Sequence, residues 1–174
     1  MTVVVPYDPD WPSQFEAERE LLERALEPWL EGGIHHIGST AIPGIAAKPI
    51  IDMIAGVREL EESRAAFEPL FELGYEETPH RPGTHHFSKP AGGPWTHGLH
   101  LTEPGSNLWE ERLAFRDALR ADPALVAEYA ALKQRMLDEE RRGGPGYDSG
   151  AKRAFVARVL ADAAGITLPP TGWR

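Results

Sequence analysis

The hydrophobic and polar positions change period along the chain, and the changes predict the order of its elements. Apolar runs at 34–37 and 50–57 are typical of buried strands, whereas three- and four-residue spacing over 59–73 predicts a helix. The other expected strands are 75–78, 85–89 and 95–102, and the other expected helices run from 9–13 to Trp29 and over 107–121, 123–141 and 149–164. This order predicts one α+β domain over 1–174, with a mixed sheet and a helical C-terminal tail.

Glycine and proline divide these elements. Gly32–Gly33 is expected to follow the first helix and Gly74 to end the second. Pro79–Gly83 and Pro90–Pro94 flank the strand at 85–89, which predicts a hairpin whose loops border a cleft. Pro123 suits the first turn of a helix that Asp122 precedes.

One carboxylate interrupts the apolar run at 50–57. Asp52 is the only charged residue in that run. An ionised carboxylate in a buried strand needs a cation, a raised pKa or a position that opens onto a cleft. Asp52 is therefore the first candidate for a functional residue.

A turn of small residues connects the first two expected strands. Gly38 allows the backbone to leave the strand sharply, and Ser39 or Thr40 is expected to cap a short helix whose N–H groups favour an anion. Lys48 adds a positive charge just before the second strand. These features are typical of phosphate binding, and the alternative is a tight turn with an ordinary cap.

Several separated motifs resemble the GrpB family from one end of the chain to the other. They are VVVPYDPDWPSQFEAE near the N-terminus, GSTAIPGIAAKPIID from Gly38, THGLHL from Thr96, FRDALRADPALVAEYAALK from Phe115 and KRAFV from Lys152. The family is similar to proteins of the nucleotidyltransferase fold. Their signature is a Gly–Ser or Gly–Gly turn, followed about a dozen residues later by an acidic, apolar, acidic triplet on a strand.

The resemblance assigns roles to individual positions. Gly38 and Ser39 take the turn positions, Asp52 takes the first acidic position, and Ile54 stands at the second. Nucleotidyltransferases use two strand carboxylates and a third from a later strand to hold paired metal ions. With one aspartate, the resemblance implies a single Mg²⁺ or Mn²⁺ held by Asp52 and substrate phosphates, because Mg²⁺ often uses only one or two carboxylates.

The histidines suggest a different metal. All seven lie between His35 and His100, and imidazole beside Asp52 suits a transition metal better than magnesium. A strand over THGLHL places Gly98 and His100 on one face and His97 on the other, and His100 resembles the most regular histidine of the family. Asp52 and His100 are thus candidate catalytic residues and alternative metal ligands. Ordinary polar positions on a half-exposed sheet remain the other interpretation of the histidines.

Other basic residues are candidates for ligand binding. Arg81, Lys89 and Lys152 are expected to contact phosphate, and Tyr147 with Lys152 could close over a ligand. Their alternative is ordinary surface charge, which is the favoured interpretation for Arg112. Tyr129 has the spacing of a core contact.

Composition limits the classes of partner. The net charge of −9 argues against broad nucleic-acid binding but allows a small phosphorylated ligand. The chain has no cysteine, so disulfides and thiol catalysis are excluded. No apolar run approaches the length of a membrane span, and a cytoplasmic protein is expected. The sequence does not specify an oligomeric state.

Two functions of different classes remain. The first is binding of a nucleotide or related phosphorylated metabolite in a nucleotidyltransferase-like cleft, with metal-dependent nucleotidyl or phosphoryl transfer as its extension. The second is a catalytically inactive ligand-sensing or protein-interaction module of the same fold, which the replacement of an acidic residue by Ile54 motivates.

Overall fold

A mixed five-stranded sheet forms the centre of the part of the chain that the structure describes. The structure is a computed structural model, and it describes residues 2–79, 81–144 and 150–168. The strands are β1 (Leu30–Ile37), β2 (Ile51–Val57), β3 (Glu76–Glu77), β4 (His85–Lys89) and β5 (His97–Thr102), in the order β1-β2-β5-β4-β3. β2 and β5 are parallel, and the other neighbours are antiparallel. The mixed sheet and the β4–β5 hairpin are confirmed.

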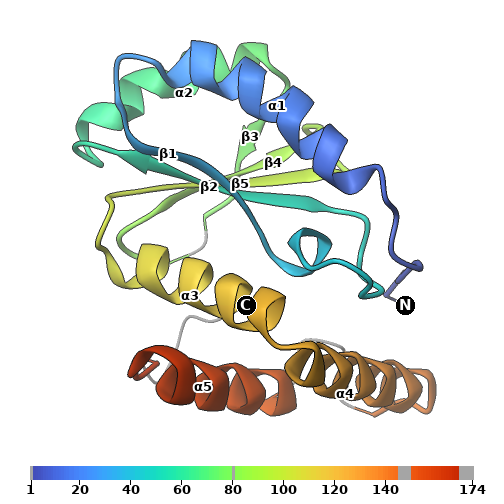
Figure 1. Cartoon of the computed structure of the whole chain (residues 1–174). Helices are drawn as coiled ribbons and strands as arrows, with labels where there is room; N and C mark the ends of the chain where they lie inside the picture. The colour runs from blue at the N-terminus through green and yellow to red at the C-terminus, as the bar shows by residue number, and fades with distance from the viewer. Residues whose placement is uncertain (1, 80, 145–149, 169–174) are drawn as a thin grey trace.

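Helices cover both faces of this sheet (Figure 1). α1 (Trp11–Leu26) and α2 (Phe67–Glu72) lie over one face, and α3 (Asn107–Ala121) lies over the other. α4 (Pro123–Arg141) and α5 (Gly150–Ala164) lie beyond α3. The α+β class with a helical tail is therefore confirmed. None of the helices in the described ranges is long and apolar enough to cross a membrane.

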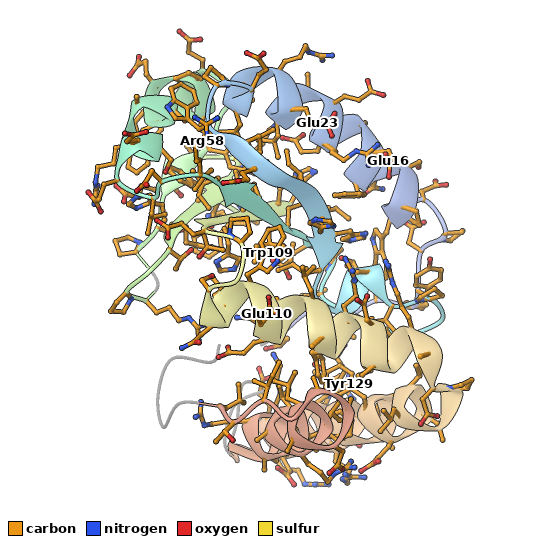
Figure 2. The ribbon with its side chains drawn as sticks, turned by 60° about the vertical axis from the view of Figure 1, so that its left-hand side comes forward. Glu16, Glu23, Arg58, Trp109, Glu110 and Tyr129 are labelled. Carbon is orange, nitrogen blue, oxygen red and sulfur yellow. The ribbon has the colours of Figure 1, made fainter. Side chains whose placement is uncertain are left out.

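The two faces of the sheet belong to different clusters of apolar side chains. Met53, Leu99 and Phe87 pack with α1 and α2 in the larger cluster. On the opposite face, Ile54 packs beneath Trp109, which projects from α3 toward the sheet (Figure 2). Strand residues alternate between faces, so Asp52, two positions from Ile54, also faces α3.

The helical tail is joined to the loop before β2 by a third cluster. Ile42 and Ile45 from that loop pack against Phe115 of α3 and against α4 and α5. Tyr129 of α4 stacks on Phe155 of α5, with ring centroids 5.1 Å apart. Burial of Tyr129 confirms the core position expected from its spacing. The tail thereby fixes one wall beside the turn that follows β1.

α3 and α4 have the bounds that the sequence predicts, whereas two other helices differ from the prediction. Asp122 caps α4 through Ala124 N at 2.8 Å, and Pro123 is its first residue, as predicted. α1 ends at Leu26 rather than Trp29, because Pro28 has no N–H for a helical bond. The helix expected over 59–73 is instead a 3₁₀ helix (Glu62–Ala66) followed by α2, whose first turn contains Pro69.

Strand boundaries also shift. β1 begins at Leu30, four residues before the expected start, because Gly32 and Gly33 adopt positive φ and accommodate an irregularity in the pairing with β2. β3 is limited to Glu76–Glu77, and β5 begins at His97 rather than Trp95. The expected start of the last helix at Ser149 lies outside the described residues.

Candidate functional site

A cavity of about 300 Å³ opens on the α3 face of the sheet. Its walls come from the turn after β1, from β2, β4 and β5, and from all three C-terminal helices. Seven of the sequence-predicted residues line it: Gly38, Ser39, Thr40, Lys48, Asp52, His100 and Lys152. The fold thus brings residues that lie up to 114 positions apart to one place.

Two glycines enclose the Asp52 carboxylate. A Cβ at Gly38 would lie 2.7 Å from Asp52 Oδ2, and a Cβ at Gly98 would lie 2.8 Å from Oδ1. Gly38 also has a φ of +72°, which disfavours any other residue. The carboxylate is therefore confined between β1 and β5, at the point where β2 opens onto the cavity.

The expected cap at the turn is absent. Gly38 precedes a 3₁₀ helix at Ser39–Ala41, and neither Ser39 nor Thr40 caps it. Both residues lie inside this short helix, and the Thr40 hydroxyl instead donates to Ile50 O at 2.9 Å. Ser39 lines the cavity, so its hydroxyl is a candidate ligand contact rather than a structural cap.

The electrostatic environment gives Asp52 an unusual proton affinity. Burial raises the pKa of its carboxyl to about 6, although the nearby cations Arg112, Lys152 and Lys48 oppose this shift. A carboxyl group with a pKa near neutrality in a cleft is suited to proton transfer or to binding a cation that replaces the proton.

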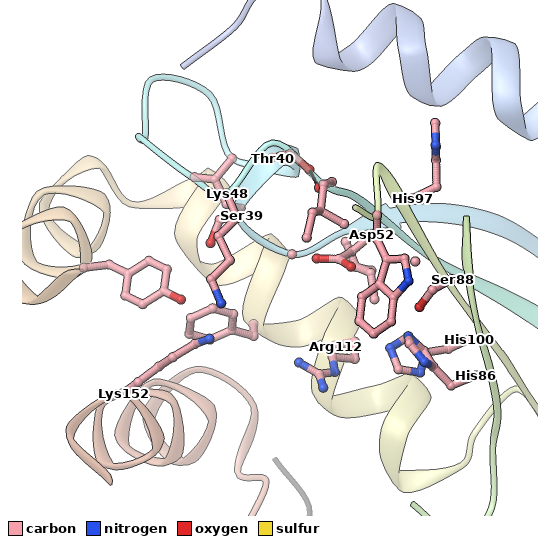
Figure 3. Close-up of a pocket in the computed structure, with 18 residues that line it drawn as sticks. Ser39, Thr40, Lys48, Asp52, His86, Ser88, His97, His100, Arg112 and Lys152 are labelled. Atoms are coloured by element: carbon pink, nitrogen blue, oxygen red, sulfur yellow. Dashed lines mark hydrogen bonds between the residues drawn. The ribbon is translucent and has the colours of Figure 1, made fainter. Parts of the chain in front are cut away.

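Three cations approach this carboxylate from different elements. Lys48 precedes β2, Arg112 lies on α3 and Lys152 lies on α5 (Figure 3). Behind them, buried Lys133 donates to Ala46 O at 2.9 Å, and its pKa is lowered to about 7 by burial and by Lys152 and Lys48. Cationic side chains from three different elements therefore surround the single carboxylate of this cavity.

A pair of histidines forms the opposite wall. The rings of His86 on β4 and His100 on β5 are 4.4 Å apart at their centroids (Figure 3). His86 Nδ1 lies 2.7 Å from the Thr78 hydroxyl oxygen and 3.2 Å from Thr78 O, so Thr78 orients the ring and leaves Nε2 directed toward the cavity. His86 Nε2 would lie 3.6 Å from a Gly98 Cβ, which places it on the Asp52 side.

The other histidines take separate positions. His97 lies at the cavity rim and approaches Glu18 of α1, with Nε2 and Oε2 4.0 Å apart. Gly98 and His100 share the Asp52 face, which confirms their predicted parity. His35 Nε2 forms a hydrogen bond with Gly32 O, and His36 Nε2 forms one with Thr40 Oγ1. His85 bonds to Leu60 O on the α1 face, and His80 lies outside the described residues.

Comparison with known proteins identifies the family. The family model described as GrpB protein matches residues 2–162. The chain belongs to the GrpB family. It is 40% identical to the UPF0157 protein YqkA of Bacillus subtilis over 137 residues, which cover 76% of this chain but only 39% of YqkA. The crystal structure of the conserved protein GrpB from Enterococcus faecalis matches with a TM-score of 0.80 and 30% identity, covering 92% of this chain and 96% of that one.

More distant structures show that this GrpB chain has a nucleotidyltransferase-like fold. The GLD-2/RNP-8 complex matches with a TM-score of 0.58 and 12% identity, covering 94% of this chain and 63% of the other. The Cid1 poly(U) polymerase with Mg and 3′-dATP bound matches with a TM-score of 0.52 and 14% identity, covering 90% of this chain and 49% of the other. These likenesses show the fold alone.

The GrpB chain departs from the expected pattern of metal ligands. Ile54, at the second acidic position, is fully buried and packs with Trp109. Within the described ranges, no three His, Asp or Glu side chains are placed to hold a metal ion. Asp52 and His100 remain the two candidate ligands from the protein. One carboxylate fits a divalent ion that arrives with substrate phosphates.

Two predicted phosphate contacts lie outside the cavity wall. Lys89 points to the α1 face, where Nζ lies 2.8 Å from Glu18 Oε1. Arg81 bonds through Nη2 to Glu111 Oε2 at 3.1 Å, in a nearly buried ion pair at the base of α3. Tyr147, expected to close over a ligand with Lys152, is outside the described residues.

Two further cavity residues were not predicted as contacts. Arg112 was interpreted as surface charge, although its spacing from Trp109 and Phe115 places all three on one face of α3. Trp95 lines the cavity while remaining 46% exposed, and its indole N–H donates to Glu76 Oε1 at 3.2 Å. An apolar ring between Pro94 and Thr96 in a glycine-rich loop was the signal available in the sequence.

Proposed function

We propose that this GrpB-family protein binds a nucleotide or related phosphorylated metabolite in the cavity beside Asp52. The observation that carries the proposal is the convergence of Lys48, Arg112 and Lys152 on a carboxylate held between two glycines. The cations would bind phosphate oxygens, for which guanidinium offers two parallel donors and ammonium a compact charge. Ser39 would add a hydroxyl donor from the turn.

We further propose that binding is metal-dependent. Asp52 would hold one Mg²⁺ or Mn²⁺ together with ligand phosphates, and such an ion neutralises charge on the phosphate that is transferred. Arg112 and Lys152 would orient the phosphates. With Asp52 on the metal ion, the His86 and His100 pair would receive the proton of an attacking hydroxyl, and the leaving phosphate group would depart with the metal ion. The resulting activity would be nucleotidyl or phosphoryl transfer.

Calorimetry tests ligand binding directly. The protein is titrated with ATP, GTP, CTP and dephospho-CoA, each with Mg²⁺ or Mn²⁺. We expect saturable binding of at least one of them, weakened at least tenfold in Asp52→Asn without any loss of melting temperature. Asp162→Asn is the matched control, because this aspartate is exposed on α5. No binding at millimolar concentration to any of the four would contradict the proposal.

An inactive binding module is the second candidate. The buried Ile54 at the second acidic position favours it, because paired metal ions need more carboxylates than Asp52 provides. This alternative predicts ligand binding without turnover. Metal-dependent consumption of nucleotide by the wild type, absent in Asp52→Asn, would exclude it.

Elemental analysis separates the two metal hypotheses. If phosphates supply the remaining ligands, protein purified without a tag or chelator should carry no stoichiometric metal until a polyphosphate is added. Near-stoichiometric zinc, nickel or iron that is lost in His100→Ala would instead establish the site formed by Asp52 and His100.

A further inference from the structure

A second cavity lies along the outer side of β1, which is an edge strand of the sheet. It has a volume of about 390 Å³ and is bounded by α1, the turn after β1 and the second half of α3. Four charged side chains line it: Arg19, Arg116, Arg120 and Glu16. This excess of arginine contrasts with the net charge of −9 on the whole chain.

Backbone carbonyls fix two of these arginines in place. Arg116 Nη1 donates to His36 O on the edge of β1 at 3.1 Å, and Arg120 Nε donates to Ala41 O at 2.9 Å. Arg116 also pairs with Asp117 at 2.7 Å. Arg120 uses Nε alone among its nitrogens within the described ranges, so both of its terminal nitrogens can donate to a ligand.

The His36 ring that lines this cavity is uncharged at neutral pH. His36 stacks on Phe15 of α1 with ring centroids 4.9 Å apart. The Thr40 hydroxyl gives its proton to Ile50 O, so His36 Nε2 must donate to Thr40 Oγ1, which fixes the tautomer. Burial, together with Arg120 and Arg116, lowers the pKa of His36 to about 4. The positive charge of this cavity at neutral pH therefore comes from arginine rather than from His36.

We propose that this cavity is a second binding site, for a small metabolite that carries a phosphate or carboxylate group. Guanidinium groups match the paired oxygens of both anions. Arg120 and Arg19 would contact the anion, and the rings of Tyr7 and Phe15 would pack against its apolar part. Arg19 reaches the same place, since its guanidinium carbon lies 5.8 Å from the Phe15 ring centroid. Its Nη2 pairs with Glu16 Oε2 at 2.6 Å, so Arg19 would contact the anion through its other nitrogens.

The site is distinct from the Asp52 cavity although the two share a wall. Thr40 lines both, and its hydroxyl is already used between His36 and Ile50. The cations are different: Lys48, Arg112 and Lys152 serve the first cavity, whereas the arginines of α1 and of the end of α3 serve the second. An anion can therefore be assigned to one cavity by the residues it perturbs.

Amide NMR of the full chain, titrated separately with pyrophosphate and citrate at constant ionic strength, tests the proposal. We expect saturable shifts at His36, Ala41 and Arg120 with at least one probe, and the preferred probe separates phosphate from carboxylate chemistry. Arg120→Gln should weaken this binding about tenfold, the value of one charge-assisted hydrogen bond. Any shifts at Lys48 and at Asp52 should saturate as in the wild type.

Matched variants make the outcome decisive. Arg24→Gln removes the same charge from an exposed position of α1 outside the cavity and should leave the affinity unchanged. Arg19→Gln, which leaves both arginine–carbonyl bonds intact, should weaken binding even if Arg120→Gln lowers the melting temperature. Equal effects of Arg24→Gln and Arg120→Gln, or no saturable shift around His36 with either probe, would overturn the proposal.

Discussion

The two faces of the sheet bury charged groups in different ways. On the α1 face, Glu18 accepts from Tyr75 Oη at 2.8 Å and from Lys89 Nζ at 2.8 and 3.1 Å, so its charge is matched by a cation in direct contact. On the α3 face, Asp52 lies near Arg112, Lys152 and Lys48, beside a cavity, and burial raises the pKa of its carboxyl to about 6. The first arrangement is a direct ion pair between a helix and the sheet, whereas the second places charged groups of both signs around a cavity.

The α3 face is itself divided between an apolar part and a polar part. Ile54 and Trp109 fill one part, and two residues away Asp52 faces the cavity. This boundary falls where a nucleotidyltransferase would have its second acidic residue. In this chain that position serves helix packing, which leaves Asp52 as the carboxylate that β2 presents to the cavity.

Restoring the second carboxylate should produce the largest loss of stability. Ile54→Asp places a charge beneath Trp109 in a fully buried position, and we expect it to lower the free energy of unfolding by about 4 kcal/mol or more. Urea denaturation measures the change. Ile54→Val, as control, should cost about 1 kcal/mol. A stable Ile54→Asp variant with increased Mg²⁺ affinity would show that this position still belongs to the cavity.

Removing the ion pair between Glu18 and Lys89 should cause the next largest loss of stability. Glu18→Gln leaves Lys89 without its carboxylate on the α1 face, and we expect a loss of about 3 kcal/mol in the free energy of unfolding. The neighbouring Glu16→Gln, which removes an exposed ion pair with Arg19, should cost less than about 1 kcal/mol.

The affinity for a nucleotide in the Asp52 cavity is a second property to measure in Glu18→Gln and Glu16→Gln. Neither Glu18→Gln nor Glu16→Gln should change the affinity for a nucleotide at temperatures where the protein is folded. A selective loss of nucleotide affinity in Glu18→Gln would mean that the two faces are coupled and that the contrast between them is too simple.

The ionisation of Asp52 should oppose folding. Its pKa rises from 3.8 to about 6 on folding, so the native state holds the proton more tightly and its stability falls as pH rises between these values. The full shift corresponds to about 3 kcal/mol. Asp52→Asn should therefore match the wild type near pH 4 and be more stable than it near pH 7. Denaturation at both pH values checks this, and a difference that does not change with pH would refute it.

The sequence predicted what depends on local pattern. Asp52 was identified because it interrupts an apolar run, and Gly98 and His100 were placed on one face because strand residues alternate. The cap at Asp122 followed from a proline at the first helical position. Each of these inferences uses residues that lie only a few positions apart, so none depends on how distant elements meet.

Contacts between distant elements could not be predicted in this way. Alternation puts His86 and Lys89 on opposite faces of β4, but only the pairing of His86 with His100 decides which of the two faces Asp52. Predicting the position of Arg112 requires the rotation of α3 about its own axis. That rotation is set by the packing of Trp109 on Ile54. The sequence alone therefore did not show that Arg112 faces the cavity or that Lys89 and Arg81 lie outside its wall.

The smallest expected effect concerns the exposed ring at the mouth of the Asp52 cavity. Trp95 is held through Glu76 while almost half of its surface remains exposed, so it can stack on a planar ring. If the ligand is a nucleotide, Trp95→Ala should weaken ATP binding about tenfold, the value of one stacked base, and leave tripolyphosphate binding unchanged. Calorimetry with both ligands measures the ratio. Phe71→Ala, at an exposed ring on α2 away from the cavity, is the control. Equal weakening of ATP and tripolyphosphate would show that Trp95 shapes the loop rather than contacting a base, and the cations of the α3 face would then be the main determinants of affinity.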